Sequence, residues 1–97
     1  MVYVIASKVL ENCLDYSVVK EIRLSNTVGE EVMRRMARQG ILQFFPHFAR
    51  PYFRIDRGQY YVIQGVFGDT SVRVTFSPLA DLGTEDQLRS LIETPEN

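Results

Sequence analysis

The sequence predicts an α+β fold, in which a single, mainly antiparallel sheet of four to six strands carries two or three helices on one face. The chain has 97 residues, which suits one domain, and residues 1–97 are taken as that domain. Short runs rich in β-branched and aromatic residues, separated by turn residues, fill the region from 41 to 77. Segments with a helical spacing of apolar residues lie before and after that region.

The first quarter of the chain predicts a strand, a short helix and a second strand. Val2–Ala6 is an apolar run without helical spacing, as in a buried strand. Ser7 is a suitable N-cap for a helix over about 8–15. That helix would place Cys13 on its apolar arc, and therefore in the core. Val18–Leu24 ends in alternating charged and apolar residues, which predicts a half-buried strand.

Residues 27–39 form the clearest predicted helix. Asn26 or Thr27 would cap its start, and Gly40 would end it. Glutamates in its first turn stand four residues before arginines, so ion pairs are expected on the solvent side. The pairs are Glu30–Arg34 and Glu31–Arg35, and the apolar face consists of Val28, Val32, Met33, Met36 and Ala37.

Four further strands are predicted at 41–45, 52–56, 59–67 and 70–77, with a proline-containing loop at 46–51. Thr84 is expected to cap a last helix, in which Leu88, Leu91 and Ile92 form the apolar stripe and after which Pro95 follows. From 18 to 93 the order strand, helix, strands, helix contains a ferredoxin-like half, so a ferredoxin-like arrangement is one form that the sheet can take.

Composition excludes several classes of protein. Hydrophobic residues make up 45% and charged residues 24%, which argues against disorder. We expect no membrane span and no secretory signal, because no long apolar stretch and no leading cationic region are present. A single cysteine fits a reducing, cytoplasmic location. The net charge of -1 disfavours a non-specific nucleic-acid binder.

Catalytic and metal-binding patterns are missing from the sequence. Cys13 and His47 are the only pair that could form a thiolate–imidazole site, and one cysteine with one histidine does not make a zinc site. Gly65 and Gly68 do not open a helix, so they do not form a phosphate loop. We therefore expect a protein that is not an enzyme and has no cofactor or metal.

The unusual segment is 44–61, which holds seven of the eleven aromatic residues together with interleaved arginines. Tyrosine and arginine are enriched at protein interfaces, so the favoured hypothesis is an interaction module that self-associates or docks on a protein partner. The alternative is an RNA- or nucleotide-like-ligand-binding module, in which bases stack on the rings. A purely structural interpretation, with core phenylalanines and solvated arginines, also stays open. The candidate binding residues are His47, Arg50, Tyr52, Phe53, Arg54, Arg57, Tyr60 and Val62.

The strand register determines how many apolar side chains lie on the second face of the sheet, which is the face that the predicted helices do not cover. A two-residue turn at Gly68-Asp69 pairs Ile63 with Val74 and Tyr61 with Phe76. A two-residue turn at Arg57-Gly58 would gather a patch on the second face, whereas a three-residue turn would return two of its members, Phe53 and Ile55, to the core. We favour the two-residue turn, and with it a homodimer that covers the patch of Phe53, Ile55, Tyr60, Val62 and Val66.

Overall fold

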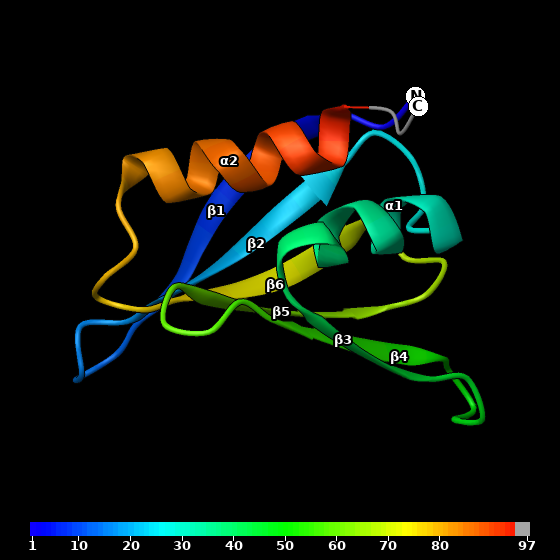
Figure 1. The fold of residues 1–97 in the computed structure, drawn as a ribbon, viewed down its shortest axis with the longest axis horizontal. Coiled ribbons are helices and arrows are strands. Elements are labelled where there is room, and N and C mark those ends of the chain that lie inside the picture. The colour runs from blue at the N-terminus through cyan, green and yellow to red at the C-terminus, as the bar shows by residue number, and fades with distance from the viewer. Residues whose placement is uncertain (95–97) are drawn as a thin grey trace.

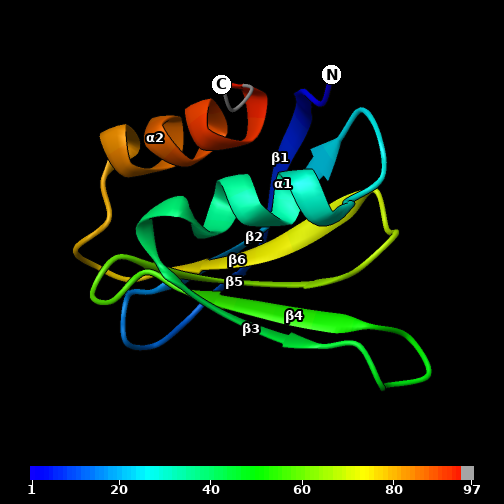
Figure 2. The same cartoon turned by 45° about the vertical axis from the view of Figure 1, so that its right-hand side comes forward.

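The computed structural model describes residues 1–94 and consists of one six-stranded antiparallel sheet with both α-helices on the same face (Figures 1 and 2). The strands lie side by side in the order β1-β2-β6-β5-β4-β3. The elements in chain order are β1 (Val4–Asn12), β2 (Val18–Leu24), α1 (Glu30–Met36), a 3₁₀ turn η1 (Ala37–Gln39), β3 (Ile41–Phe45), β4 (Tyr52–Asp56), β5 (Tyr61–Val66), β6 (Ser71–Phe76) and α2 (Leu82–Glu93).

The α+β class and the single antiparallel sheet are confirmed, but the ferredoxin-like arrangement is not. Four strands separate α1 from α2, and within residues 1–94 no strand follows α2. A ferredoxin-like domain has two strands between its helices and one after the second. In the part of the chain that is described, no helix has the length and apolar character needed to cross a bilayer.

The predicted helix over 8–15 is wrong, because β1 continues to Asn12 and pairs with β2 as an antiparallel hairpin. Two register shifts, between Val4 and Ala6 and between Val9 and Glu11, insert extra residues into β1. Such bulges break the two-residue alternation that identifies a strand, so the apolar residues mimic helical spacing. Cys13 consequently lies half-buried in the hairpin turn and not on a helix in the core.

The β5–β6 hairpin has the predicted register, with Ile63 opposite Val74 and Tyr61 opposite Phe76. The predicted strands at 18–24, 41–45 and 52–56 are also confirmed at both ends. Only 52–56 alternates throughout, whereas 18–24 alternates over its last four residues and 41–45 is a short uncharged run ended by Pro46.

The favoured two-residue turn at Arg57-Gly58 is wrong. The backbone N–H of Arg57 donates to the carbonyl of Tyr61, and Ile55 pairs with Ile63, so the connection is longer than two residues. This register puts Phe53 and Ile55, both 0% exposed, on the face that packs against the helices. The apolar patch expected on the opposite face therefore does not form and gives no support to a homodimer.

Gly65 shows how closely β4 and β5 pack. It lies opposite Phe53, and a Cβ atom at this position would come within 2.6 Å of Cζ of the Phe53 ring. The absence of a side chain at Gly65 therefore makes room for the Phe53 ring.

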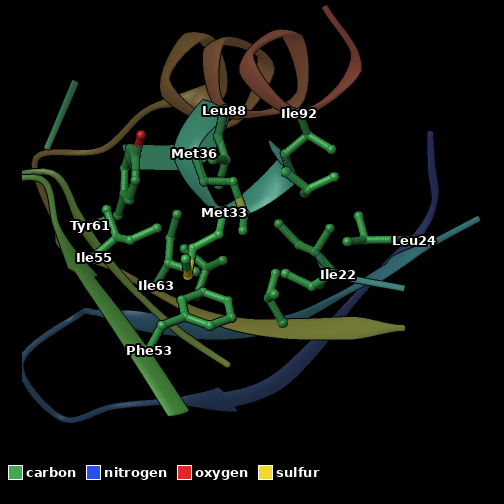
Figure 3. Close-up of a cluster of buried hydrophobic side chains, with 14 of the residues drawn as sticks. Ile22, Leu24, Met33, Met36, Phe53, Ile55, Tyr61, Ile63, Leu88 and Ile92 are labelled. Carbon is green, nitrogen blue, oxygen red and sulfur yellow. The ribbon is translucent and has the colours of Figure 1, made fainter. Parts of the chain in front are cut away.

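The core lies between the sheet and the two helices, where apolar side chains from both layers converge (Figure 3). The predicted face of α1 is confirmed, since Val28, Val32, Met33 and Met36 are buried and Ala37 is partly buried. The predicted caps Asn26 and Thr27 are wrong, because α1 begins later and has Gly29 as its N-cap without a side-chain bond. Gly40 ends the 3₁₀ turn as expected.

Helix α2 begins two residues before the predicted cap. Asp81 is the N-cap and Thr84 occupies the third helical position, and their side chains form a reciprocal capping box. The predicted apolar stripe is confirmed, because Leu88, Leu91 and Ile92 are all buried. Pro95 lies outside the described residues.

Arg35 is buried between the two helices, which corrects the expectation of an exposed ion pair. The residue is 4% exposed, and Nη1 donates to the carbonyl oxygen of Ile92, in the last turn of α2, at 3.0 Å. Its Nη2 donates to Glu31, as the four-residue spacing predicted. Arg35 thus ties α1 to α2, whereas the neighbouring pair of Arg34 and Glu30 is exposed.

We predict that Arg35→Ala destabilises the fold by about 1–3 kcal/mol, because it leaves the buried Ile92 carbonyl without its charged donor. The matched variant Arg34→Ala removes an exposed pair of the same spacing and should change stability by at most about 0.5 kcal/mol. Urea unfolding followed by circular dichroism measures both. Equal unfolding midpoints for the two variants would contradict the tether.

Candidate functional site

The candidate site is the β3–β4 hairpin at one end of the sheet, which extends past the helices in both views (Figures 1 and 2). β3 is the last strand, so β4 pairs with one of its sides and the other side is a free edge among residues 1–94. An edge strand presents unpaired backbone N–H and C=O groups. These groups are the first chemical feature of the site.

The backbone groups that face the free edge belong to Leu42 and Phe44. Hydrogen-bonded pairs alternate along antiparallel strands. Between β4 and β5, the Arg57 N–H donates to the Tyr61 carbonyl and the Phe67 N–H donates to the Pro51 carbonyl. The odd-numbered residues of β4 therefore direct their backbone groups toward β5. The even-numbered residues of β4 direct their backbone groups toward β3, where they form hydrogen bonds with residues 41, 43 and 45. The alternate residues, Leu42 and Phe44, must point their N–H and C=O groups away from β4.

The side chains of β3 are apolar on both faces and carry no charge. The five residues are Ile-Leu-Gln-Phe-Phe, and Ile41 is 71% exposed while Phe44 and Phe45 are each 38% exposed. Leu42 and Phe44 lie on the helix face, opposite Ile55 and Phe53. Ile41, Gln43 and Phe45 lie on the outer face. A short, uncharged, apolar edge of this kind favours pairing with a further strand.

The opposite edge, β1, has the features that prevent such pairing. It contains two register shifts, and the charged residues Lys8 and Glu11 are exposed on it. The carboxylate of Glu93, on α2, accepts a hydrogen bond from the Val4 N–H at 2.9 Å and so occupies an edge donor. Bulges, charges and cover by other elements are the usual protections of an edge strand. The chain thus protects one edge of its sheet and leaves the other open.

Aromatic rings lie on both faces of the sheet near the Phe45 end of β3. Phe45, Phe48 and Tyr52 stack on the outer face, with ring centroids 5.4 Å apart for Phe45 and Phe48 and 5.8 Å apart for Phe45 and Tyr52. On the helix face, the ring centroids of Phe44 and Phe67 are 5.8 Å apart. We call Ile41, Leu42, Phe44, Phe45 and Phe48 the edge patch.

The structure separates the predicted binding residues into three groups and one buried residue. His47 and Arg50 are exposed in the loop before β4, where Arg50 pairs with Asp69 at 2.8 Å. Tyr52, Arg54 and Val62 are half-buried on the outer face. Arg57 and Tyr60 lie at the far end of β4, with the guanidinium 5.3 Å from the centre of the ring. Phe53 is fully buried, so the prediction that it binds a partner is wrong.

Sequence reasoning did not select the members of the edge patch as binding residues, although three of them fall in the segment 44–61. The available signal was a five-residue uncharged strand ended by Pro46. Its position at the sheet edge depends on the strand order, which the sequence did not reveal.

A second candidate, an end cleft of about 420 Å³, lies between the start of α2 and the β1–β2 turn. Its walls are mainly apolar, with Ser77 and Asp81 also lining it, and it contains an ion pair between Lys20 and Glu85, with Nζ 2.7 Å from Oε2. Ser7 donates to the other carboxylate oxygen at 2.8 Å. Burial raises the pKa of Glu85, but the hydrogen bonds from Lys20 and Ser7 and the lysine charge outweigh it, so the net pKa lies below its ordinary value. Because both oxygens already accept hydrogen bonds, the pair is suited to joining α2 to the sheet.

Within residues 1–94 no group of three or more histidine, cysteine, aspartate or glutamate side chains is placed to hold a metal ion. Comparison of the chain with known protein families, curated proteins and solved structures finds no match. The edge patch is therefore the feature of the structure that bears most directly on function.

We predict that Glu85→Gln lowers stability at neutral pH by about 0.5–1.5 kcal/mol, because it removes the ion pair with Lys20. A carboxylate with a lowered pKa stabilises the fold above its unfolded-state pKa and loses this contribution as the pH falls through its folded-state pKa. The difference from wild type should therefore shrink below about pH 4. Thermal melts from pH 3 to 7 measure this. Asp86→Asn, on the exposed neighbour, is the control, and a difference for Glu85→Gln that persists at pH 3 would contradict the assignment.

Proposed function

We propose that this chain is a non-enzymatic interaction module that binds an extended segment of a protein partner along the free edge of β3. The observation that carries the proposal is the open, uncharged edge of Ile41–Phe45 on a sheet whose other edge is protected. Addition of a strand to such an edge is a recurrent mode of peptide recognition. The lone cysteine fits a reducing compartment, so we propose a cytoplasmic location.

Backbone hydrogen bonds would supply part of the affinity. The outward-facing groups of Leu42 and Phe44 are arranged to exchange hydrogen bonds with an antiparallel segment, in the spacing of an ordinary sheet. These bonds replace bonds to water, so each contributes modestly. Specificity would have to come from the side chains.

The edge patch offers apolar contacts on both faces of the added strand. Phe45 and Ile41 lie on the outer face, and Leu42 and Phe44 lie on the helix face. A bound segment would therefore place alternate side chains against different apolar surfaces. Tyr52 and Arg54, on the neighbouring strand, extend the outer surface with residue types that are enriched at interfaces.

We predict that a peptide copying residues 40–46, labelled with fluorescein and flanked by lysines for solubility, binds the protein. Phe44→Pro should weaken binding at least about tenfold, because proline removes the N–H that faces the edge and leaves the bonds to β4 in place. Fluorescence anisotropy at low protein concentration measures the affinity.

The control is Phe44→Ala, which removes the same ring and keeps the N–H. It should bind more tightly than Phe44→Pro, and both variants should keep the circular dichroism spectrum of the wild type. Equal binding by the two variants, or no binding of the peptide by the wild type, would argue against strand addition at this edge.

A second candidate function is binding of single-stranded RNA or a nucleotide-like ligand. The observation in its favour is the stack of Phe45, Phe48 and Tyr52, with Arg54 on the same face as Tyr52. Rings and arginines of this kind hold unpaired bases and phosphates. The rings contact one another, however, and Arg50 is paired with Asp69, so fewer of these groups are open to RNA.

The two functions differ in their dependence on salt. If strand addition is correct, a labelled oligouridylate of ten nucleotides should show no binding at either 50 or 200 mM salt. RNA binding through phosphates would weaken steeply over this range. Binding that weakens in this way and is lost in Phe48→Ala would replace the strand-addition proposal with the RNA proposal.

A further inference from the structure

We propose that the partner at the β3 edge is a second copy of this chain, paired antiparallel with the first about a twofold axis that passes beside Gln43. The inference rests on the proposed function and identifies the occupant of the same edge. It does not depend on the outer-face patch that the observed register removed.

The backbone of β3 is suited to pairing with itself. With the axis at Gln43, Leu42 of one copy lies opposite Phe44 of the second copy, and these are the residues whose N–H and C=O groups face outward. Each such pair exchanges two hydrogen bonds, and the axis repeats the exchange. Pro46, which has no N–H to donate, follows the last residue of the strand and limits the pairing to this short segment.

The side chains are also compatible with a twofold axis. The axis brings the side chain at position 43 beside its own counterpart, so a charge there would face a like charge. Ile41–Phe45 carries no charge. Ile41 would lie opposite Phe45 of the second copy, and the neutral amide of Gln43 would lie opposite its equivalent.

The assembly would close after two copies. The far edge of each sheet is β1, which its bulges, charges and the Glu93 carboxylate protect from further pairing. A symmetric interface between identical edges uses up the open edge of both copies. A discrete dimer with one continuous sheet is therefore favoured over a filament.

A dimer must bury more than the two backbones, and the edge patch supplies the additional surface. Ile41 is 71% exposed and Phe48 is 58% exposed, and both lie next to the pairing edge. Stable interfaces bury roughly 1,200–2,000 Å² in total, and a short strand with its flanking rings is at or below the lower end. We therefore expect a reversible dimer.

Sedimentation velocity and disulfide trapping together test the inference. The wild type should be a dimer at high micromolar concentration. Gln43→Lys should raise the dimer dissociation constant by about tenfold or more, because two lysines would meet at the axis, each beside Arg54. Ala6→Lys, an exposed outer-face position on the opposite edge, is the matched control and should leave the dimer unchanged.

Trapping tests the register. Gln43 and its counterpart form a non-hydrogen-bonded pair, whose Cα atoms are about 4.5 Å apart, within the range that a disulfide spans. In a Cys13→Ser background, Gln43→Cys should form a covalent dimer on mild oxidation. Ile41→Cys should not, because its counterpart would lie about 13 Å away along the strand.

Two results would overturn the inference. In the first, the wild type is a monomer at several hundred micromolar and the Gln43→Cys variant forms no covalent dimer. In the second, the Ile41→Cys variant cross-links as fast as the Gln43→Cys variant. Binding of the 40–46 peptide separates the two proposals. If the peptide still binds in the first case, the edge accepts an added strand, and only the pairing of two folded copies has failed.

Discussion

The arrangement of this molecule depends on which face of β4 carries Phe53 and Ile55, and the β4–β5 connection decides it. Side chains alternate along a strand, so a change of one residue in that connection would turn both side chains to solvent. The observed register pairs Ile55 with Ile63 and Phe53 with Gly65, where only a glycine leaves room for the ring. With these side chains inside, both helices have an apolar surface to cover, and the outer face keeps its mixed, half-polar character.

The helical layer in turn determines which edge stays open. Arg35 ties α1 to the last turn of α2, and Glu93 in that turn reaches the Val4 N–H at the edge of β1. Lys20 and Ser7 join the first turns of α2 to the same side of the sheet through Glu85. These contacts hold the helices toward β1, while the β3–β4 hairpin extends beyond them at the other end (Figure 2). The position of the helices thus explains both why the β1 edge is covered and why the β3 edge is open.

The sequence predicted those features that a local pattern of residues determines. It did not predict those that depend on contacts with an element distant in the chain. Local patterns in Val18–Leu24 and in the segments 41–45 and 52–56 predicted three strands, whereas two bulges in β1 hid the continuation of the first strand beyond Ala6. The four-residue spacing of Glu31 and Arg35 predicted their ion pair. The burial of Arg35 and its second hydrogen-bond acceptor, the Ile92 carbonyl, depend on α2 and were not predicted. The aromatic segment was recognised as unusual for the same local reason. Its edge position was not, because strand order depends on contacts among all six strands.

Gln43, at the middle of β3, leaves the open edge without a charge. The side chain of Gln43 is exposed, so a charged residue at this position would protect the edge, as charged residues do in many edge strands. The chain has Lys8 and Glu11 on β1, yet an uncharged amide between apolar neighbours on β3. An edge that is neither covered, bulged nor charged exposes the chain to uncontrolled pairing. A short strand that meets a specific partner avoids that hazard, since the partner satisfies the backbone groups of Leu42 and Phe44 and removes their apolar side chains from water.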